Sequence, residues 1–500
     1  MTSFFRRLEP AHWIALGAAL LLLPRLGQGP LHTPWETHHA AVAARMAEDG
    51  PASAFTPAVG DEAYLERPAT GYWLGALATR VFGPGTFAAR LPSALAGVLL
   101  LWAAFVLVRR GRGTRAGALV AGVLATTPLC ALLFRSARPD ALAVTASCGS
   151  FLALAAAAVD PGAPRRVAWA GWALLGLAAG LGGLPAVAPP LAAIVLFATL
   201  GGRRPAWGAL RPLAGLAIAV VVAAPLVVPP LALHGAAVTR AFFRPDVAEE
   251  SPADDEKVKD RGRPDDRMGA DVDFEALAWG AFPWSILAPA ALIGLSLRRR
   301  RDVPPEPNRG LEPAAGVLAE PRPQGRGSDG AGSPGLADGE ADERGRAFDF
   351  ACVLWAVAAG GTAAILGDRF HHAPYGALVP VAVLVGLYVA RKLDGEWSAV
   401  DAALTIAGIG LLAVCAHDLA GGARLAQAAG YFRPELPALP KSVAAQLAWP
   451  LRLATLGAGA ALLGALLLRR WRWWIAAAAV AVSLAWTLGV VHVLGTLSAG

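Results

Sequence analysis

The chain has 500 residues, of which 55% are hydrophobic and 16% are charged, and its formal net charge is +7. Apolar runs long enough to cross a hydrocarbon layer recur along the whole length, and a soluble protein cannot bury that many of them. The composition therefore excludes a soluble protein and predicts an all-α polytopic membrane protein. Nearly all the positive charge is arginine, which accumulates in cytoplasmic loops of membrane proteins, so no nucleic-acid partner is predicted.

The apolar runs predict about thirteen transmembrane helices, including a retained first span. These spans cover residues 11–27, 91–108, 115–134, 139–158, 167–182, 184–200, 209–233, 275–297, 348–366, 374–390, 398–416, 449–468 and 473–496. With the N-terminus in the cytoplasm, every basic cluster between spans falls on the cytoplasmic side, as the positive-inside rule requires. Within this topology, Gly182 to Pro185 must form a very tight outer turn.

Three long segments connect the spans. Residues 28–90 form a first outer loop in which apolar residues recur at helical spacing, as expected for amphipathic juxtamembrane helices. Residues 299–347 are rich in Pro, Gly, Asp and Glu and are predicted to be a disordered cytoplasmic linker. The linker divides an N-terminal transmembrane module, residues 1–298, from the C-terminal helices, residues 348–500. A mixed-charge outer loop is expected at 249–273.

Composition also bears on redox chemistry and on the source membrane. The four cysteines lie inside apolar spans without metal-type spacing, so they are interpreted as small buried hydrophobic residues. The bias toward Arg, Ala, Gly and Pro is typical of a GC-rich bacterial genome. We therefore expect a multi-pass protein of the bacterial cytoplasmic (inner) membrane, with a cytoplasmic N-terminus.

Ionisable residues gather at the outer mouths of the spans, where they are costly and by default indicate function. They are Glu36, His38, His39, Asp61, Glu62, Glu66, Arg67, Arg135, Arg138, Asp140, Arg369, His371 and His372. Arginine offers a bidentate fork to phosphate oxygens, and a carboxylate can take a proton from an attacking hydroxyl. This pattern suits a phosphate-bearing, lipid-linked substrate whose tail lies along the spans.

Several short motifs follow one another in a characteristic order after the first span. They are Trp35-Glu36-Thr37-His38-His39-Ala40, Tyr64-Leu65-Glu66-Arg67-Pro68, Tyr72-Trp73-Leu74, Phe82-Gly83 and Ala89-Arg90-Leu91-Pro92-Ser93-Ala94-Leu95. Together they resemble the first third of family 39 glycosyltransferases, the group of dolichyl-phosphate-mannose–protein mannosyltransferases and aminoarabinose transferases. Phe282-Pro283-Trp284-Ser285 and the turn from Arg369 to Tyr375 resemble later landmarks of that family.

The resemblance implies a GT-C-like fold with an active site on the outer, periplasmic face. It implies a glycosyltransferase of the cell envelope that moves a hexose or pentose from a polyprenyl-phosphate donor, without a nucleotide, to a lipid, glycan or protein acceptor. In this interpretation the donor phosphate is held by Arg67, Arg138 and Arg369. Glu36 or Asp140 orients or deprotonates the acceptor, and an Arg138–Asp140 ion pair that caps the fourth span is the alternative for those two residues.

The remaining candidates are assigned to the substrate cavity. They are His38, His39, Glu66, Tyr72, His371, His372 and Tyr375. Adjacent histidines point to different faces of a helix, so hydrogen bonding to sugar or phosphate is favoured, and no metal ligand or cofactor is assigned. A divalent cation shared with His371 and His372 is the alternative.

Three positions depart from the family pattern. Trp35 stands where relatives have Asp, Arg67-Pro68-Ala69 replaces Lys-Pro-Pro, and Leu181 replaces a Lys. These departures motivate a second hypothesis, a catalytically degenerate member with a binding or scaffold role. A transporter or flippase for a lipid-linked sugar is a third, which predicts mid-span charges and paired repeats.

Overall fold

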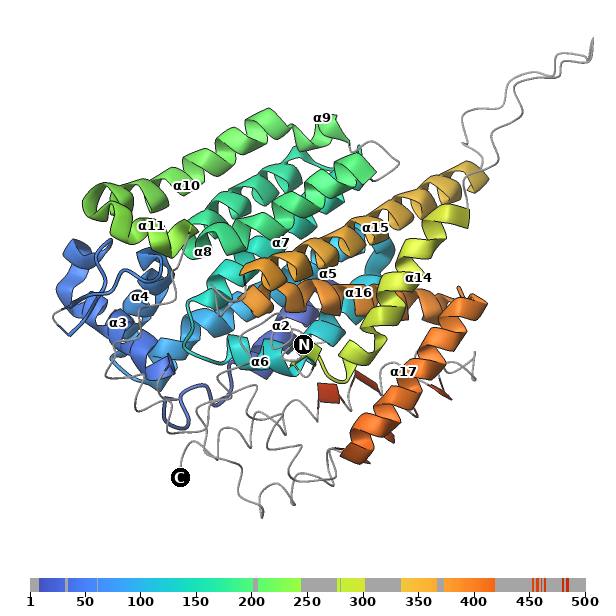
Figure 1. Ribbon diagram of the computed structural model, residues 1–500, viewed down its shortest axis with the longest axis horizontal. Helices are drawn as coiled ribbons and strands as arrows, with labels where there is room; N and C mark the ends of the chain where they lie inside the picture. The colour runs from blue at the N-terminus through green and yellow to red at the C-terminus, as the bar shows by residue number, and fades with distance from the viewer. Residues whose placement is uncertain are drawn as a thin grey trace, which may run out of the picture.

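The computed structural model describes residues 9–31, 35–60, 62–200, 206–243, 277–278, 280–301, 334–366 and 373–418, with short pieces between 452 and 484. The described part consists mostly of helices that run side by side along one long axis (Figure 1). Arg369, His371, His372, Asp61 and the loop 249–273 lie outside the described residues. The side chains of Trp35 and Tyr375 lie outside them as well, although both residues have helical backbones.

The first outer loop folds into a cap of short elements after helix α2 (Pro10–Leu22). In chain order these are α3 (Trp35–Asp49), η1 (Gly50–Ser53), the paired strands β1 (Ala58–Val59) and β2 (Glu62–Ala63), η2 (Ala69–Tyr72) and α4 (Trp73–Phe82). Helix α4 buries the small residues Gly75, Ala76 and Ala78 and leaves the apolar side chains of Leu77 and Val81 exposed, as suits a helix at a membrane interface. The predicted helices of the loop are thus present.

Helices α5 (Thr86–Ala125) and α8 (Arg165–Leu200) are each too long for one span and contain a non-helical glycine, Gly113 and Gly183. Gly183 has a φ of 63°, which L side chains rarely adopt, so the chain can reverse there. The amide of Ala206, just beyond α8, bonds to the carbonyl of Ala158, so α8 ends beside the place where it began. The tight turn expected at 182–185 is therefore present, and its place on the outer side stays a prediction.

The centre of the bundle is helix α7 (Asp140–Val159), in which almost every residue is buried. Around it lie α5, both halves of α8, α15 (Pro334–Leu366) and α16 (Ala373–Asp394), which Figure 1 shows on several sides of it. Phe151 of α7 stacks on Trp355 of α15 with ring centroids 4.3 Å apart. Small residues bring α7 and α8 together, since Gly171 lies against Leu154.

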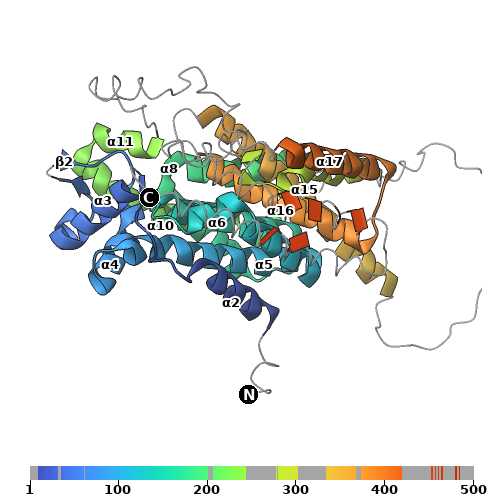
Figure 2. The same ribbon diagram turned by 90° about the horizontal axis from the view of Figure 1, so that it is seen from below.

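The remaining helices flank this centre and are described by their bounds alone. They are α6 (Pro128–Phe134), α9 (Trp207–Leu210), α10 (Pro212–His234), α11 (Ala236–Phe243), η3 (Trp284–Leu287), α14 (Ala288–Arg301) and α17 (Ala399–Asp418). Figures 1 and 2 both place α3, α4 and α11 together at one end of the bundle. We call this the capped end.

One part of the predicted linker is helical instead of disordered. Helix α15 begins at Pro334, so residues 334–347 of the expected linker 299–347 belong to it, and α14 extends to Arg301. Ion pairs explain the order: Arg346 contacts Asp342 one turn earlier at 3.2 Å, and Arg344 contacts Asp160 at 3.6 Å. Residues 302–333 lie outside the described part. The boundaries of the two modules stay a prediction.

Six helices of the described part are long and apolar enough to cross a membrane. Two of them are α5 and α8, whose internal glycines coincide with predicted turns between spans. The polytopic all-α architecture is therefore confirmed. The count of thirteen spans stays a prediction.

Candidate functional site

The cap places Glu36 in the first turn of α3, where it meets Arg90 in the first turns of α5. The guanidinium of Arg90 donates from Nε to Oε1 at 3.0 Å and from Nη2 to Oε2 at 2.7 Å. Both residues are buried, with exposed fractions of 2% for Glu36 and 6% for Arg90. The amide of Ala137 also donates to Glu36 Oε1, at 2.7 Å. Glu36 is therefore a buried carboxylate that accepts hydrogen bonds from Arg90 and from the Ala137 amide.

Arg90 uses its remaining donors on the chain that enters the cap. Nη1 contacts the carbonyls of Leu26 and Gln28 at 3.3 and 3.4 Å, and Nη2 donates to the carbonyl of Pro30 at 2.9 Å. Such a fully hydrogen-bonded guanidinium offsets the cost of burying its charge. We call the Arg90–Glu36 pair with these partners the clamp.

A second ion pair lies in the same end of the bundle. Arg67 follows β2 and contacts Asp140, the first residue of α7, through Nη1 and Oδ1. A carboxylate at a helix N-terminus is also favoured by the helix dipole. The side chain of Arg67 is 18% exposed and that of Asp140 is 6% exposed. This pair is thus less enclosed than the clamp, and the structure brings together two residues that the sequence analysis placed in the site.

Aromatic residues and histidines surround Arg67. His39 Nδ1 and the Tyr72 hydroxyl are 2.8 Å apart, and the Tyr72 and Tyr64 rings meet edge-on with centroids 6.1 Å apart. The ring of His38 packs edge-on against Tyr64 with centroids 4.8 Å apart. His38, His39 and Tyr72 therefore share one cluster with Arg67, whereas Glu66 is exposed.

Burial and nearby cations set the protonation of this cluster. Burial, together with the positive charges of Arg67 and Arg138, lowers the pKa of His39 to about 3, although Asp140 acts in the opposite direction. Burial also raises the pKa of Tyr72 well above its usual value, and that of Tyr64 less strongly. At neutral pH the cluster therefore holds a neutral imidazole and two neutral phenols beside the Arg67 cation.

A small cavity of about 30 Å³ opens beside this cluster. Its walls include His39, Tyr72, Ser93 and Arg138. This volume is enough for roughly one or two water molecules. Arg138 lines this cavity and, like Arg67 and Asp140, lies close enough to His39 to affect the pKa of its imidazole.

Two of the predicted roles depend on residues outside this part of the structure. Arg369, His371 and His372 are not among the described residues, and the side chain of Tyr375 is not described. Among the described residues no group of three metal-ligating side chains occurs. The divalent cation and the third phosphate-binding arginine stay predictions.

Sequence reasoning did not assign a role to Arg90. The available signal was its position: a single arginine at the outer end of a predicted span breaks the positive-inside trend. Sequence reasoning also assigned no role to Ser93, whose hydroxyl donates to the carbonyl of Arg138 at 3.0 Å.

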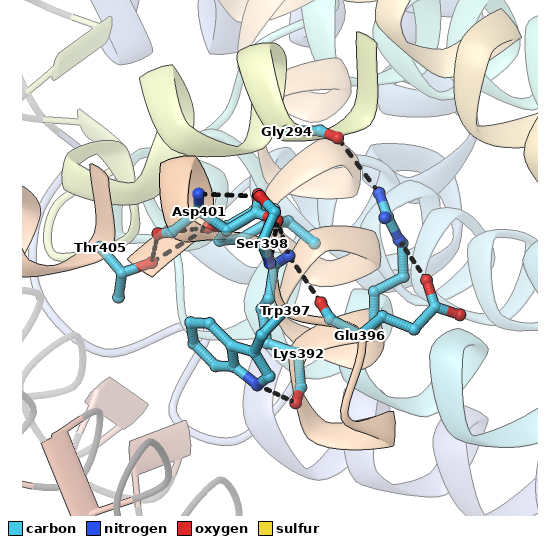
Figure 3. A network of polar contacts seen from close by, with 9 residues as sticks. Gly294, Lys392, Glu396, Trp397, Ser398, Asp401 and Thr405 are labelled. Atoms are coloured by element: carbon cyan, nitrogen blue, oxygen red, sulfur yellow. Dashed lines mark hydrogen bonds and ion pairs between the residues drawn. The ribbon is translucent and has the colours of Figure 1, made fainter. Parts of the chain in front are cut away.

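Another polar network lies where α16 ends and α17 begins (Figure 3). Lys392 contacts Asp401 at 2.7 Å, and Arg391 contacts Glu396 at 3.0 Å and the carbonyl of Gly294 at 3.4 Å. Ser398 bonds to Asp401 and immediately precedes α17, which begins at Ala399. These contacts join α14, α16 and α17, and we assign the network to the packing of these helices.

The fold and the capped end together define a class, the polytopic helical membrane proteins with the fold of ArnT. The crystal structure of ArnT from Cupriavidus metallidurans bound to undecaprenyl phosphate superimposes with a TM-score of 0.67 at 18% identity, covering 98% of this chain and 78% of that one. The apo structure of the same protein gives a TM-score of 0.66.

Sequence comparisons find similarity to one group of glycosyltransferases. The family profile described as dolichyl-phosphate-mannose-protein mannosyltransferase matches residues 66–228. The undecaprenyl phosphate-alpha-4-amino-4-deoxy-L-arabinose arabinosyl transferase of Pseudomonas aeruginosa is 32% identical over 35% of this chain and 32% of its own length. Its counterpart from Pectobacterium atrosepticum is 29% identical over 56% of this chain and 48% of its own length. The resemblance to family 39 glycosyltransferases is confirmed, and the matches span about a third to a half of these relatives.

Proposed function

We propose that the chain is an integral-membrane glycosyltransferase that moves a sugar from a polyprenyl-phosphate donor to an acceptor on the non-cytoplasmic side. The observation that carries this proposal is the Arg67–Asp140 pair at the capped end of an ArnT-like fold. A partly exposed cation beside a helix N-terminus suits a phosphate, and a carboxylate next to it suits an acceptor proton. Figure 2 places α3 and α4 at this end, away from the first turns of α15.

In the proposed reaction the donor phosphate takes the place of the Asp140 carboxylate on Arg67. The acceptor hydroxyl or amine then forms a bond to the anomeric carbon while the bond from that carbon to the phosphate oxygen breaks. The electron pair of the broken bond stays on the polyprenyl phosphate, where Arg67 and Arg138 stabilise the charge. The acceptor proton passes to Asp140, which its release from Arg67 leaves more basic.

The contacts of Glu36 favour Asp140 over Glu36 as the proton acceptor. Glu36 accepts three hydrogen bonds and pairs with the Arg90 guanidinium, so its carboxylate is strongly stabilised in the charged form. These donors already engage both oxygens of the Glu36 carboxylate. The catalytic role predicted for Glu36 stays a prediction, and we favour a role in holding the site together.

The relatives bear on the sugar and on the donor lipid. The curated relatives are named as arabinosyl transferases, which favours a pentose such as an aminoarabinose over a hexose. The crystal structure with undecaprenyl phosphate favours a polyprenyl chain of that kind as the donor lipid. Whether the acceptor is a lipid, a glycan or a protein is left open in the proposal. His38, His39, Tyr72, His371, His372 and Tyr375 would contact the sugar or phosphate, and Arg369 the phosphate.

The test uses the purified full chain in lipid nanodiscs, with undecaprenyl phosphate as the probe. We expect Arg67→Ala to weaken binding of the probe by roughly tenfold or more, because a charge-assisted hydrogen bond to phosphate is lost. The matched control is Arg45→Ala, which removes an exposed arginine from α3, a helix of the same cap, that pairs with Asp49 at 3.0 Å. Equal affinity in the wild type and Arg67→Ala would remove Arg67 from the phosphate site.

A second candidate function is binding or scaffolding without transfer. It is favoured by the saturated contacts of Glu36 and by Trp35, which begins α3 at the position where relatives carry an acid. The two functions differ in turnover. Release of the sugar from undecaprenyl-phosphate-linked aminoarabinose, followed by mass spectrometry, supports the transferase; binding without release supports the scaffold.

A further inference from the structure

The backbone between α6 and α7, residues 135–139, carries Arg138 and leads directly into Asp140. It has no helical or strand hydrogen-bond pattern of its own. Polar backbone groups in such a segment must be satisfied by other parts of the chain, and those partners determine where the segment lies. The position of Asp140 against Arg67 therefore depends on what holds this turn.

Hydrogen bonds of three groups hold the turn: the Arg135 side chain, the Ala137 amide and the Arg138 carbonyl. The guanidinium of Arg135 donates to the carbonyls of Leu21, Leu22 and Pro24 at the end of α2, at 2.9 to 3.1 Å. The amide of Ala137 donates to Glu36 at 2.7 Å. The carbonyl of Arg138 accepts from Ser93 at 3.0 Å.

The contacts of Ala137 and Arg138 depend on residues in the first turns of α5. Ser93 is three residues beyond Arg90, so both lie on one face of that helix. Arg90 orients the Glu36 carboxylate through both of its oxygens, which leaves Oε1 aimed at the Ala137 amide. A bidentate guanidinium–carboxylate pair fixes orientation as well as distance, which a lysine cannot do.

We propose that Arg90 is a positioning residue for the site: acting through Glu36, it fixes the 135–139 turn and thereby the place of Asp140 relative to Arg67. The inference rests on the proposed function in one respect, that Asp140 takes part in transfer. Arg90 acts through other residues in this proposal, because its guanidinium is used by Glu36 and three backbone carbonyls. Glu36 is then the link between the helix that carries Arg90 and the turn.

Hydrogen–deuterium exchange of a peptide spanning residues 135–142 tests the turn without any ligand. We expect Arg90→Lys and Glu36→Gln to speed exchange in this peptide by roughly tenfold or more, because the oriented charge-assisted contact is lost. Arg45→Lys is the matched control and leaves exchange unchanged. If either variant folds poorly by circular dichroism, Ser93→Ala removes one contact without burying a charge and should speed exchange in the same peptide. Unchanged exchange in the folded variants overturns the proposal.

Enzyme measurements separate positioning from general stability and from the proposed function. In Arg90→Lys we expect kcat to fall by about tenfold and affinity for undecaprenyl phosphate to fall less, because the loosened turn carries Arg138 whereas Arg67 belongs to another segment. Equal losses in kcat and in lipid affinity would overturn the positioning role. If exchange is faster in the variants but the wild type binds no undecaprenyl phosphate, Arg90 fixes the turn and the proposed function is overturned.

Discussion

The two ion pairs of the capped end, Arg90–Glu36 and Arg67–Asp140, contain the same chemical groups in different surroundings. Arg90 forms two parallel bonds to Glu36 and adds backbone carbonyls, and its side chain is 7% exposed. Arg67 contacts one oxygen of Asp140 and is 18% exposed. The first pair joins the cap to α5, while the second lies beside a cavity and a cluster of neutral aromatic groups.

The difference shows how one fold can use the same charges for two purposes. A guanidinium whose partners are all protein groups has little to gain from a phosphate, because each bond to the ligand replaces an equivalent bond. A less enclosed pair can exchange a carboxylate for a phosphate at smaller cost, since both are anions of similar geometry. We therefore assign the clamp to structure and the Arg67–Asp140 pair to ligand binding.

The largest expected effect is on the free energy of unfolding, which should fall more when the Arg90–Glu36 pair is broken than when the Arg67–Asp140 pair is broken. Arg90→Met leaves the buried Glu36 charge uncompensated and should lower the free energy of unfolding by about 3–5 kcal/mol. Adding Glu36→Leu to it should recover much of this loss. Arg67→Met should cost less, because the Asp140 side chain it leaves lies at a helix N-terminus beside other polar groups. The measurement is reversible unfolding in mixed detergent micelles, and equal losses for Arg90→Met and Arg67→Met would remove the distinction.

An intermediate effect on stability is expected from pH. Of the two ion pairs, it is Arg67–Asp140 whose charges affect the pKa of His39. Its pKa of about 3 reflects burial first and then Arg67 and Arg138, opposed by Asp140, with His38 a smaller influence. Above pH 6.5 the imidazole is neutral in both folded and unfolded chains. As pH falls from 6.5 toward 3, only the unfolded chain gains the proton, so stability decreases by up to about 1.4 kcal/mol per pH unit.

The matched variant for this pH effect is His39→Gln, which cannot titrate. Between pH 7 and pH 5 it should lose on the order of 1–2 kcal/mol less unfolding free energy than the wild type. Arg67→Met should also reduce the pH dependence, because a cation that opposes protonation of His39 is removed. Identical pH profiles of the wild type and His39→Gln would contradict the neutral imidazole inferred here.

Sequence patterns could predict the fold because helices are local. Hydrophobic length and basic clusters predicted the helical membrane architecture, the turn at Gly183 and the helices of the first loop. The helical start of α15 was missed, because the ion pair from Arg344 to Asp160 joins residues far apart in the chain. Composition alone describes residues 334–347 as polar, which is a property of exposed helices as well as of linkers.

The site could be predicted only in part for a related reason. Composition and motifs brought Glu36, Arg67, Asp140 and His39 to one end of the bundle. They could not show that Glu36 meets Arg90, 54 residues away, since helical spacing gives the face of a side chain but not its partner. From sequence, an acid next to a phosphate site is a candidate base. Because Glu36 is held by a guanidinium and an amide, we favour a role in holding the turn before Asp140 in place.

The smallest expected effect tests whether Arg67 really exchanges its partner. Asp140→Asn removes the anion that competes with phosphate for Arg67, so undecaprenyl phosphate should bind about threefold to tenfold more tightly. The same variant should lose transfer activity, because no carboxylate remains to take the acceptor proton. Glu36→Gln is the matched change in the clamp and should give no gain in affinity, since Glu36 is paired with Arg90 and not with Arg67. Weaker binding in Asp140→Asn would mean that Asp140 holds Arg67 in place for the ligand, so that the second pair supports structure as the first one does.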